Sequence, residues 1–85
     1  MTNYKLNPMY TRQKSFYGKA VVNVHPNGEK VLISYSTAVA RIVNGQPVVK
    51  GTYSQTTLRH IKEFLQQHGF KAINKAQIEA DYMTA

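Results

Sequence analysis

The chain contains no cysteine among its 85 residues. A disulfide framework, a thiolate metal site and a cysteine nucleophile are therefore excluded. No apolar run approaches the roughly 20 residues that a membrane span needs, and no secretory signal pattern opens the chain. The missing cysteine leaves the redox compartment undecided. The other two absences favour a soluble intracellular domain, and the expected location is the cytoplasm, without a membrane partner.

Acidic residues are scarce, since four Asp and Glu stand against eleven Lys and Arg, for a formal net charge of +7. Up to Lys62 the only acidic residue is Glu29, so the positive excess lies in this part of the chain. A field of this sign attracts polyanions such as nucleic acid, an anionic membrane or an acidic protein surface. Charge that serves only solubility is the alternative interpretation.

Catalytic and nucleotide-binding motifs are also missing. The four acids are dispersed, so the sequence does not indicate a carboxylate pair. His60 and His68 lack the i, i+4 spacing of a metal-ligand pair, and His68 is better placed as a cation at a helix C-terminus. No glycine-rich loop opens a helix, as a P-loop or a dinucleotide fingerprint would require. We therefore expect no enzyme activity, no metal and no cofactor.

Hydrophobic residues make up 42% of the chain, which is enough for one small core and too much for a disordered basic tail. Residues 1–15 show no sustained periodicity and predict an N-terminal arm, ordered only if one of its apolar side chains docks on the domain. Residues 16–85 predict a single domain.

Two Asn-Gly pairs interrupt a β-rich stretch, with strands expected over residues 16–24, 30–43 and 48–53. Both pairs, Asn27-Gly28 and Asn44-Gly45, favour type I′ hairpin turns, because the two central residues of that turn need positive φ.

The stretch 30–43 is longer than a usual strand. It predicts either one long bent strand or two strands broken near Ser36-Thr37. Pro47 cannot donate to a ladder, so we expect the strand that follows at a sheet edge. The side chains expected to face the helix are Val22, Val24, Val31 and Ile33.

A helix is expected after Ser54, a preferred N-cap residue. Its apolar stripe consists of Leu58, Ile61, Phe64 and Leu65. Gly69 and Phe70 predict a Schellman ending, and a short second helix is expected after Asn74 as cap. The predicted fold is therefore α+β: an antiparallel β-meander of three to four strands, covered on one face by one amphipathic helix, with a short C-terminal helix.

The start of the first helix is a candidate anion site. Free backbone N–H groups and the positive dipole end favour an anion there, and hydroxyl groups add donors. The residues of this predicted corner are Ser54, Thr56 and Thr57. The alternative is that they are an ordinary cap and ordinary first-turn residues.

A basic and aromatic surface is the second candidate. Basic side chains along a groove neutralise phosphates, and tyrosines offer stacking platforms to unpaired bases. The predicted phosphate contacts are Lys19, Arg41, Lys50 and Arg59, and the predicted stacking residues are Tyr17 and Tyr53. The alternative is that the tyrosines are strand formers and the lysines keep an exposed sheet soluble.

The string TTLRHIKEFL over residues 56–65, with Ile33 to Thr37 before it and Gly69-Phe70 after it, resembles a group of small uncharacterised proteins from phages and mobile elements of Gram-positive bacteria. The resemblance covers residues 16–82. It implies a phage or accessory-gene context, and hence the host-cell cytoplasm, but no established activity and no transferable site residue.

The element order is also similar to that of the single-stranded-DNA-binding transcriptional cofactor family, in which four antiparallel strands precede a helix and the domain dimerises. Lys50-Gly51 resembles the strand-to-helix entry of that family, whereas the extension from Phe70 has no counterpart in it.

The leading hypothesis is a non-enzymatic nucleic-acid-binding module of a phage or mobile element. A second hypothesis is a phage accessory protein whose basic face binds and inhibits a host defence or transcription protein. A third is a binder of a small anionic nucleotide at the Ser54 corner. The expected partner is thus nucleic acid or an acidic host-protein surface, without a membrane, and the sequence is compatible with a homodimer.

Overall fold

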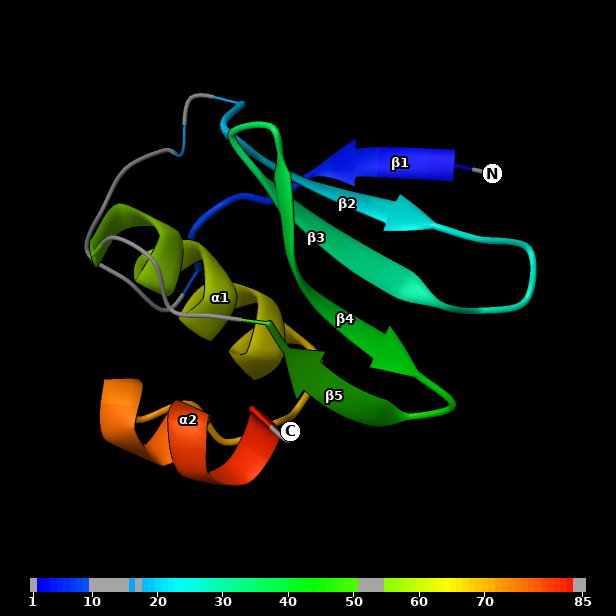
Figure 1. The fold of residues 1–85 in the computed structure, drawn as a ribbon. Coiled ribbons are helices and arrows are strands. Elements are labelled where there is room, and N and C mark those ends of the chain that lie inside the picture. Colours follow the sequence, from blue (N-terminus) through cyan, green and yellow to red (C-terminus); the bar gives the residue numbers. More distant parts are fainter. Residues whose placement is uncertain (1, 10–15, 17, 51–54, 84–85) are drawn as a thin grey trace.

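Five strands form one antiparallel sheet in sequence order in the computed structural model, which describes residues 2–9, 16, 18–50 and 55–83 (Figure 1). The strands are β1 (Thr2–Lys5), β2 (Ala20–Val24), β3 (Lys30–Ser34), β4 (Thr37–Val43) and β5 (Gln46–Val49). The helices α1 (Gln55–Gln67) and α2 (Lys75–Tyr82) lie together on one face of the sheet. The predicted α+β fold is confirmed, with one strand more than expected.

The additional strand, β1, comes from the segment expected to be an arm. Leu6, directly after β1, is only 1% exposed. An apolar side chain of the arm thus docks on the domain, which was the condition for an ordered arm. The Leu6 amide donates to the carbonyl of Ala20 at 2.8 Å. The Asn7 carbonyl accepts from the side-chain amide of Gln67 in α1 at 2.7 Å. These contacts join the N-terminal segment to both the sheet and the helix layer.

β3 and β4 are separate strands, because the chain turns at Tyr35 and Ser36, close to the break that the sequence offered as one alternative. Between β4 and β5, Asn44 and Gly45 have φ of 53° and 77°, which confirms the type I′ turn. Pro47 lies in β5, an edge strand, as its missing amide hydrogen predicts.

The hairpin between β2 and β3 has a different turn from the one expected. Gly28 has a φ of 94°, but Asn27 is not among the described residues with positive φ, so the prediction of type I′ was wrong here. The Gly28 amide donates to the His25 carbonyl at 2.9 Å, and the His25 amide donates to the Glu29 carbonyl at 2.8 Å. This is the pattern of a type I turn followed by a left-handed glycine, and Pro26 suits its first central position.

The register decides which side chains face the helices. Val22 is paired with Leu32, and both are fully buried. Val31 and Ile33 alternate with Leu32 and therefore lie on the opposite face, so their predicted orientation toward the helix was wrong. Val24 shares the face of Val22 and packs against the core, as expected. The hairpin loop is the physical cause, because it sets which residues of β3 stand opposite β2.

A bulge in β4 changes the alternation there. Leu32 pairs with Ala40, but Ile33 pairs with Ala38, so Val39 is the extra residue. Val39 and Ala40 are consequently both buried. Against this inner face pack the buried side chains of the helices, which are Ile61, Phe64 and Leu65 of α1 and Ile78 of α2.

The helix ends follow local sequence signals. Gly69 has a φ of 83°, its amide donates to Gln66, and the Phe70 amide donates to the Leu65 carbonyl at 2.9 Å. These bonds confirm the predicted Schellman ending. The Asn74 side chain accepts from the Gln77 amide at 2.8 Å and so caps α2, as predicted. Within the described ranges, neither helix combines the length and hydropathy needed to cross a membrane.

Candidate nucleic-acid interface

Basic residues from several elements lie toward one end of the sheet. In this meander, the end of β1, the start of β2, the β3–β4 turn and the end of β5 all lie at the same end (Figure 1). The first turns of α1 lie there as well, since Thr57 and His60 contact Ser34 at the end of β3. We call this group of exposed cations the basic end: Lys5, Lys19, Lys50 and Arg59.

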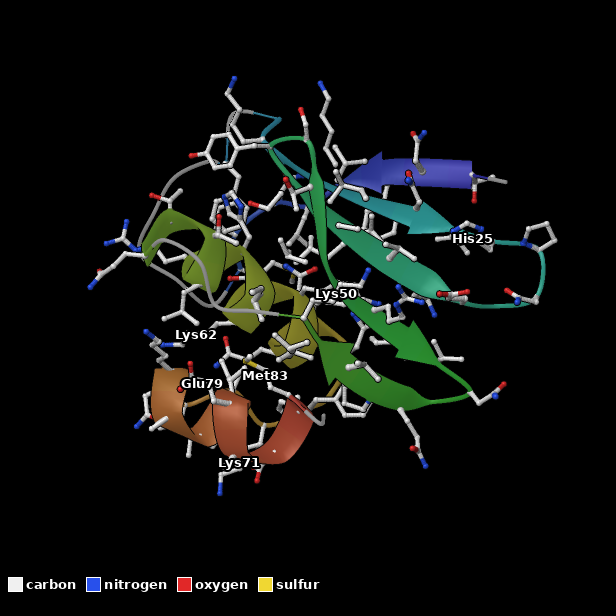
Figure 2. The ribbon with its side chains drawn as sticks, in the orientation of Figure 1. His25, Lys50, Lys62, Lys71, Glu79 and Met83 are labelled. Atoms are coloured by element: carbon white, nitrogen blue, oxygen red, sulfur yellow. The ribbon has the colours of Figure 1, made fainter. Side chains whose placement is uncertain are left out.

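Two contacts show how closely part of the basic end is assembled. A β-carbon at Gly18 would lie 3.9 Å from Cε and 4.0 Å from Nζ of Lys5, so the Lys5 side chain passes beside the residue that precedes Lys19. The Lys19 carbonyl in turn accepts from the Tyr35 amide at 2.7 Å. Lys50 lies where the chain leaves β5 (Figure 2). Because neighbouring strands are about 4.8 Å apart, β1 and β5 are separated by about 19 Å, which is the width of the sheet between Lys5 and Lys50.

The acids of the described chain do not neutralise this group. Glu29 lies at the other end of the sheet, in the β2–β3 hairpin. Glu63 is 1% exposed and accepts from the Gln67 side chain at 2.7 Å. Glu79 and Asp81 belong to α2. Among the described residues, none of the four cations of the basic end has an ion pair.

Arg41 does not belong to the basic end, although the sequence grouped it with Lys19, Lys50 and Arg59. It lies in β4 toward the opposite end of the sheet, and its guanidinium forms an ion pair with Glu29 at 3.5 Å. This pair offsets the charge that Arg41 would offer to a phosphate. Tyr17 and Tyr53, the predicted stacking residues, lie outside the described residues.

An exposed aromatic residue that the sequence analysis did not select lies at the basic end. Tyr35 occupies the β3–β4 turn with 55% of its surface exposed. Its φ is 60°, which is unusual for a bulky residue. The signal that could have found it was the break in the long β-rich stretch, because a two-residue turn exposes its central side chains.

The predicted anion corner at the start of α1 lies only partly within the described residues. Ser54 lies outside the described residues, and Thr56 is half-buried. Thr57 is 6% exposed, and its hydroxyl lies 3.1 Å from the Ser34 hydroxyl. Thr57 therefore faces the core and does not fit the proposed contact with an external anion.

Behind the basic end lies a buried polar cluster of Ser34, Thr57 and His60. The Ser34 hydroxyl is 2.8 Å from Nδ1 of His60, and the edge of the Phe16 ring packs on the imidazole with the ring centroids 4.5 Å apart. Burial lowers the pKa of His60, because desolvation disfavours the charged imidazole. A serine next to a histidine also occurs in nucleophilic catalysis. Here Ser34 is 2% and His60 1% exposed, so a substrate has no access to them in this conformation.

Metal ligands are not gathered in the described part of the chain. No group of three or more His, Asp or Glu side chains there is placed to hold an ion.

The face of the sheet opposite the helices carries mostly apolar side chains. We call it the outer sheet face, and its central side chains are half-buried residues of β2 to β5 that no described helix covers. The apolar ones are Val21, Val31, Ile33, Ala38 and Val48, and the polar ones are Asn23 and Arg41, of which Arg41 lies between Val31 and Val48. Lys5 pairs with Val21 and so borders this face at the β1 edge.

Comparison with known proteins places the chain in a family but gives it no characterised relative. No curated protein and no solved structure matches it. A family model does match, over residues 4–80, a range that runs from β1 into α2 and includes the described elements of the basic end. The chain therefore belongs to a family of unknown function, DUF8033.

Proposed function

We propose that the protein is a non-enzymatic nucleic-acid-binding module that contacts backbone phosphates through its basic end. The observation that supports this proposal is the gathering of four exposed cations from β1, the start of β2, the end of β5 and α1, without a described acid paired to them. Several unpaired cations at one end of a molecule favour a polyanion as ligand, because each contact with a phosphate releases a counterion. Such a role belongs in the host-cell cytoplasm, where nucleic acid is accessible.

Salt dependence of binding is the direct test. For short single- and double-stranded oligonucleotides, the logarithm of the association constant should fall linearly with the logarithm of the salt concentration. Each phosphate contact contributes about 0.7 to the slope for a single strand and about 0.9 for a duplex. Replacing Lys19 or Lys50 by Gln should weaken binding and lower the slope by about one contact each.

The matched control removes the same charge elsewhere on the molecule. Lys71, in the loop before α2, and Lys75, the first residue of α2, are both exposed. Their replacement by Gln should leave the slope nearly unchanged. Equal losses for Lys71→Gln and Lys19→Gln would show that only net charge matters and would contradict a localised site. Absence of binding at low salt would end the proposal.

A second function is favoured by a different observation, the uncovered outer sheet face. A largely apolar face that carries the Arg41–Glu29 ion pair and is bordered by Lys5 matches a protein partner with an apolar patch and an acidic rim. This geometry supports the hypothesis of an accessory protein that binds and inhibits a host protein. A stoichiometric partner that survives nuclease treatment and is lost in Ile33→Asn would support it.

The control for that experiment is Ile73→Asn. Ile73 is 56% exposed in the loop between the helices and is not part of the sheet, so its replacement removes at least as much apolar surface. A partner lost equally in both variants would indicate non-specific hydrophobic capture rather than recognition by the outer sheet face.

A further inference from the structure

The backbone of Tyr35 is held in a conformation that other residues adopt more easily. Its φ of 60° lies in the left-handed region, where a side chain larger than that of glycine or asparagine is strained. The other described residues with positive φ are Asn44 and four glycines. A turn that served only to join β3 to β4 would favour glycine or asparagine at this position too. The tyrosine therefore requires an explanation beyond the turn itself.

The strained turn determines where the phenol ring lies. Ser34, the preceding residue, points toward the helices, and simple alternation would direct the next side chain to the outer sheet face. Instead the ring of Tyr35 lies against His60 of α1, with centroids 5.9 Å apart and planes inclined by 39°. The ring thus contacts a buried residue, while 55% of Tyr35 remains exposed.

The support beneath Tyr35 is itself fixed. The His60 imidazole is hydrogen-bonded to Ser34 at 2.8 Å and packed edge-on by Phe16, so three rings run in sequence from the core to the surface. The Tyr35 amide donates to the Lys19 carbonyl at 2.7 Å, which fixes the backbone beside a cation of the basic end. A ring that is already ordered loses little conformational entropy when a planar ligand stacks on it.

We infer that Tyr35 is a stacking platform for an unpaired base and that it makes the basic end select single-stranded over double-stranded nucleic acid. This inference rests on the proposed function and names its substrate class. The bases of a duplex are stacked on one another and cannot offer a free face to an aromatic side chain without being unstacked. Phosphate contacts alone would not provide this preference, since both forms of nucleic acid carry phosphates.

Substitutions at Tyr35 separate recognition from structural roles. Tyr35→Gly removes the ring and its contact with His60 but also relieves the backbone strain, so the variant should fold with a stability close to that of the parent protein. Its affinity for a labelled single-stranded oligonucleotide of about 12 nucleotides should nevertheless fall by about tenfold. The affinity of Tyr35→Gly for a duplex of the same length should change less than twofold, because the variant loses only base stacking and keeps the phosphate contacts. Tyr35→Phe retains the ring face and should bind the single strand like the parent.

The matched control is Tyr4→Leu, which removes another exposed tyrosine, 42% exposed on β1. It should leave the affinity for both oligonucleotides unchanged. If the parent protein binds both forms and Tyr35→Gly binds the single strand equally well, the inference is overturned while the proposed function stands. If the parent binds neither form, the proposed function fails and the inference with it. Capture of an acidic protein in preference to the single strand would also overturn the inference.

Discussion

At the scale of single residues, the protonation state of His60 is coupled to folding. Its pKa is lowered from the ordinary value of 6.5 because the imidazole is buried. The unfolded chain therefore takes up this proton at a higher pH than the folded protein does. It follows that folding favours the neutral ring, and that acid favours the unfolded state.

We expect the free energy of unfolding to fall as the pH drops below about 6.5, and to be insensitive to His60 above that value. The decline should continue until the pH reaches the lowered pKa of the folded state. Urea unfolding between about pH 8 and pH 5 measures this dependence. In His60→Gln the decline should be shallower, and an identical profile in parent and variant would contradict the role assigned to His60.

Ser34 permits a second prediction at this scale. Its hydroxyl lies within hydrogen-bonding distance of both Thr57 and His60. Ser34→Ala leaves a buried imidazole nitrogen without this partner, which should lower the free energy of unfolding by about 1–3 kcal/mol. Ser36→Ala, in the exposed part of the same turn, is the control and should change it by less than about 0.5 kcal/mol. Equal stability of the two variants would show that the buried bonds contribute nothing.

At the scale of the elements, the ending of α1 depends on one backbone conformation. A β-carbon at Gly69 would meet no atom within 4 Å, so the cost of a substitution there arises from its φ of 83° alone. Gly69→Ala should therefore lower the free energy of unfolding by about 1–2 kcal/mol. Gly69→Asn should cost less, because asparagine tolerates the left-handed region. Thermal or urea unfolding distinguishes them, and equal losses would point to a cause other than φ.

Elements set by local chemistry could be predicted from the sequence. The Schellman ending at Gly69, the cap at Asn74 and the turn at Asn44-Gly45 each depend on a few adjacent residues. What could not be predicted depends on partners distant in the chain. β1 forms because Leu6 docks on the domain and Lys5 pairs with Val21, and no local pattern encodes these contacts.

The assignment of faces failed for a related reason. Val31 and Ile33 alternate with Leu32 and Ser34 equally well in either orientation, and only the register with β2 decides which pair is buried. That register depends on the turn after His25, where the sequence favoured the wrong turn type.

In the candidate site too, features of single residues could be predicted, whereas contacts between residues distant in the chain could not. Lys19, Lys50 and Arg59 were selected from charge, and the topology brings them to one end of the sheet. Arg41 was grouped with them because charge does not reveal that Glu29 lies beside it. Thr57 was selected as a helix-start donor, but its pairing with Ser34 joins residues 23 positions apart. Tyr35 was missed because its exposure follows from the β3–β4 turn, and the sequence did not decide between one long bent strand and two strands with a turn between them.

At the scale of the whole molecule, the net charge of +7 makes the folded state self-repulsive. Salt screens this repulsion, so stability should increase with ionic strength. We expect the melting temperature to rise by about 4 °C or more between about 0.02 M and 0.3 M NaCl, which corresponds to about 1 kcal/mol. A melting temperature that falls with added salt would indicate that favourable ion pairs outweigh the repulsion.

The strand order gives the two margins of the sheet unequal properties. β5 carries Pro47, which removes a backbone donor from that strand, whereas all four residues of β1 are exposed and none is proline. Of the two described edge strands, β1 thus keeps all of its backbone donors and acceptors, whereas β5 lacks one donor. A fibre of edge-to-edge sheets requires two edge strands on every copy that can pair with another strand. The difference between β1 and β5 therefore disfavours fibres and limits strand addition to one step, at β1.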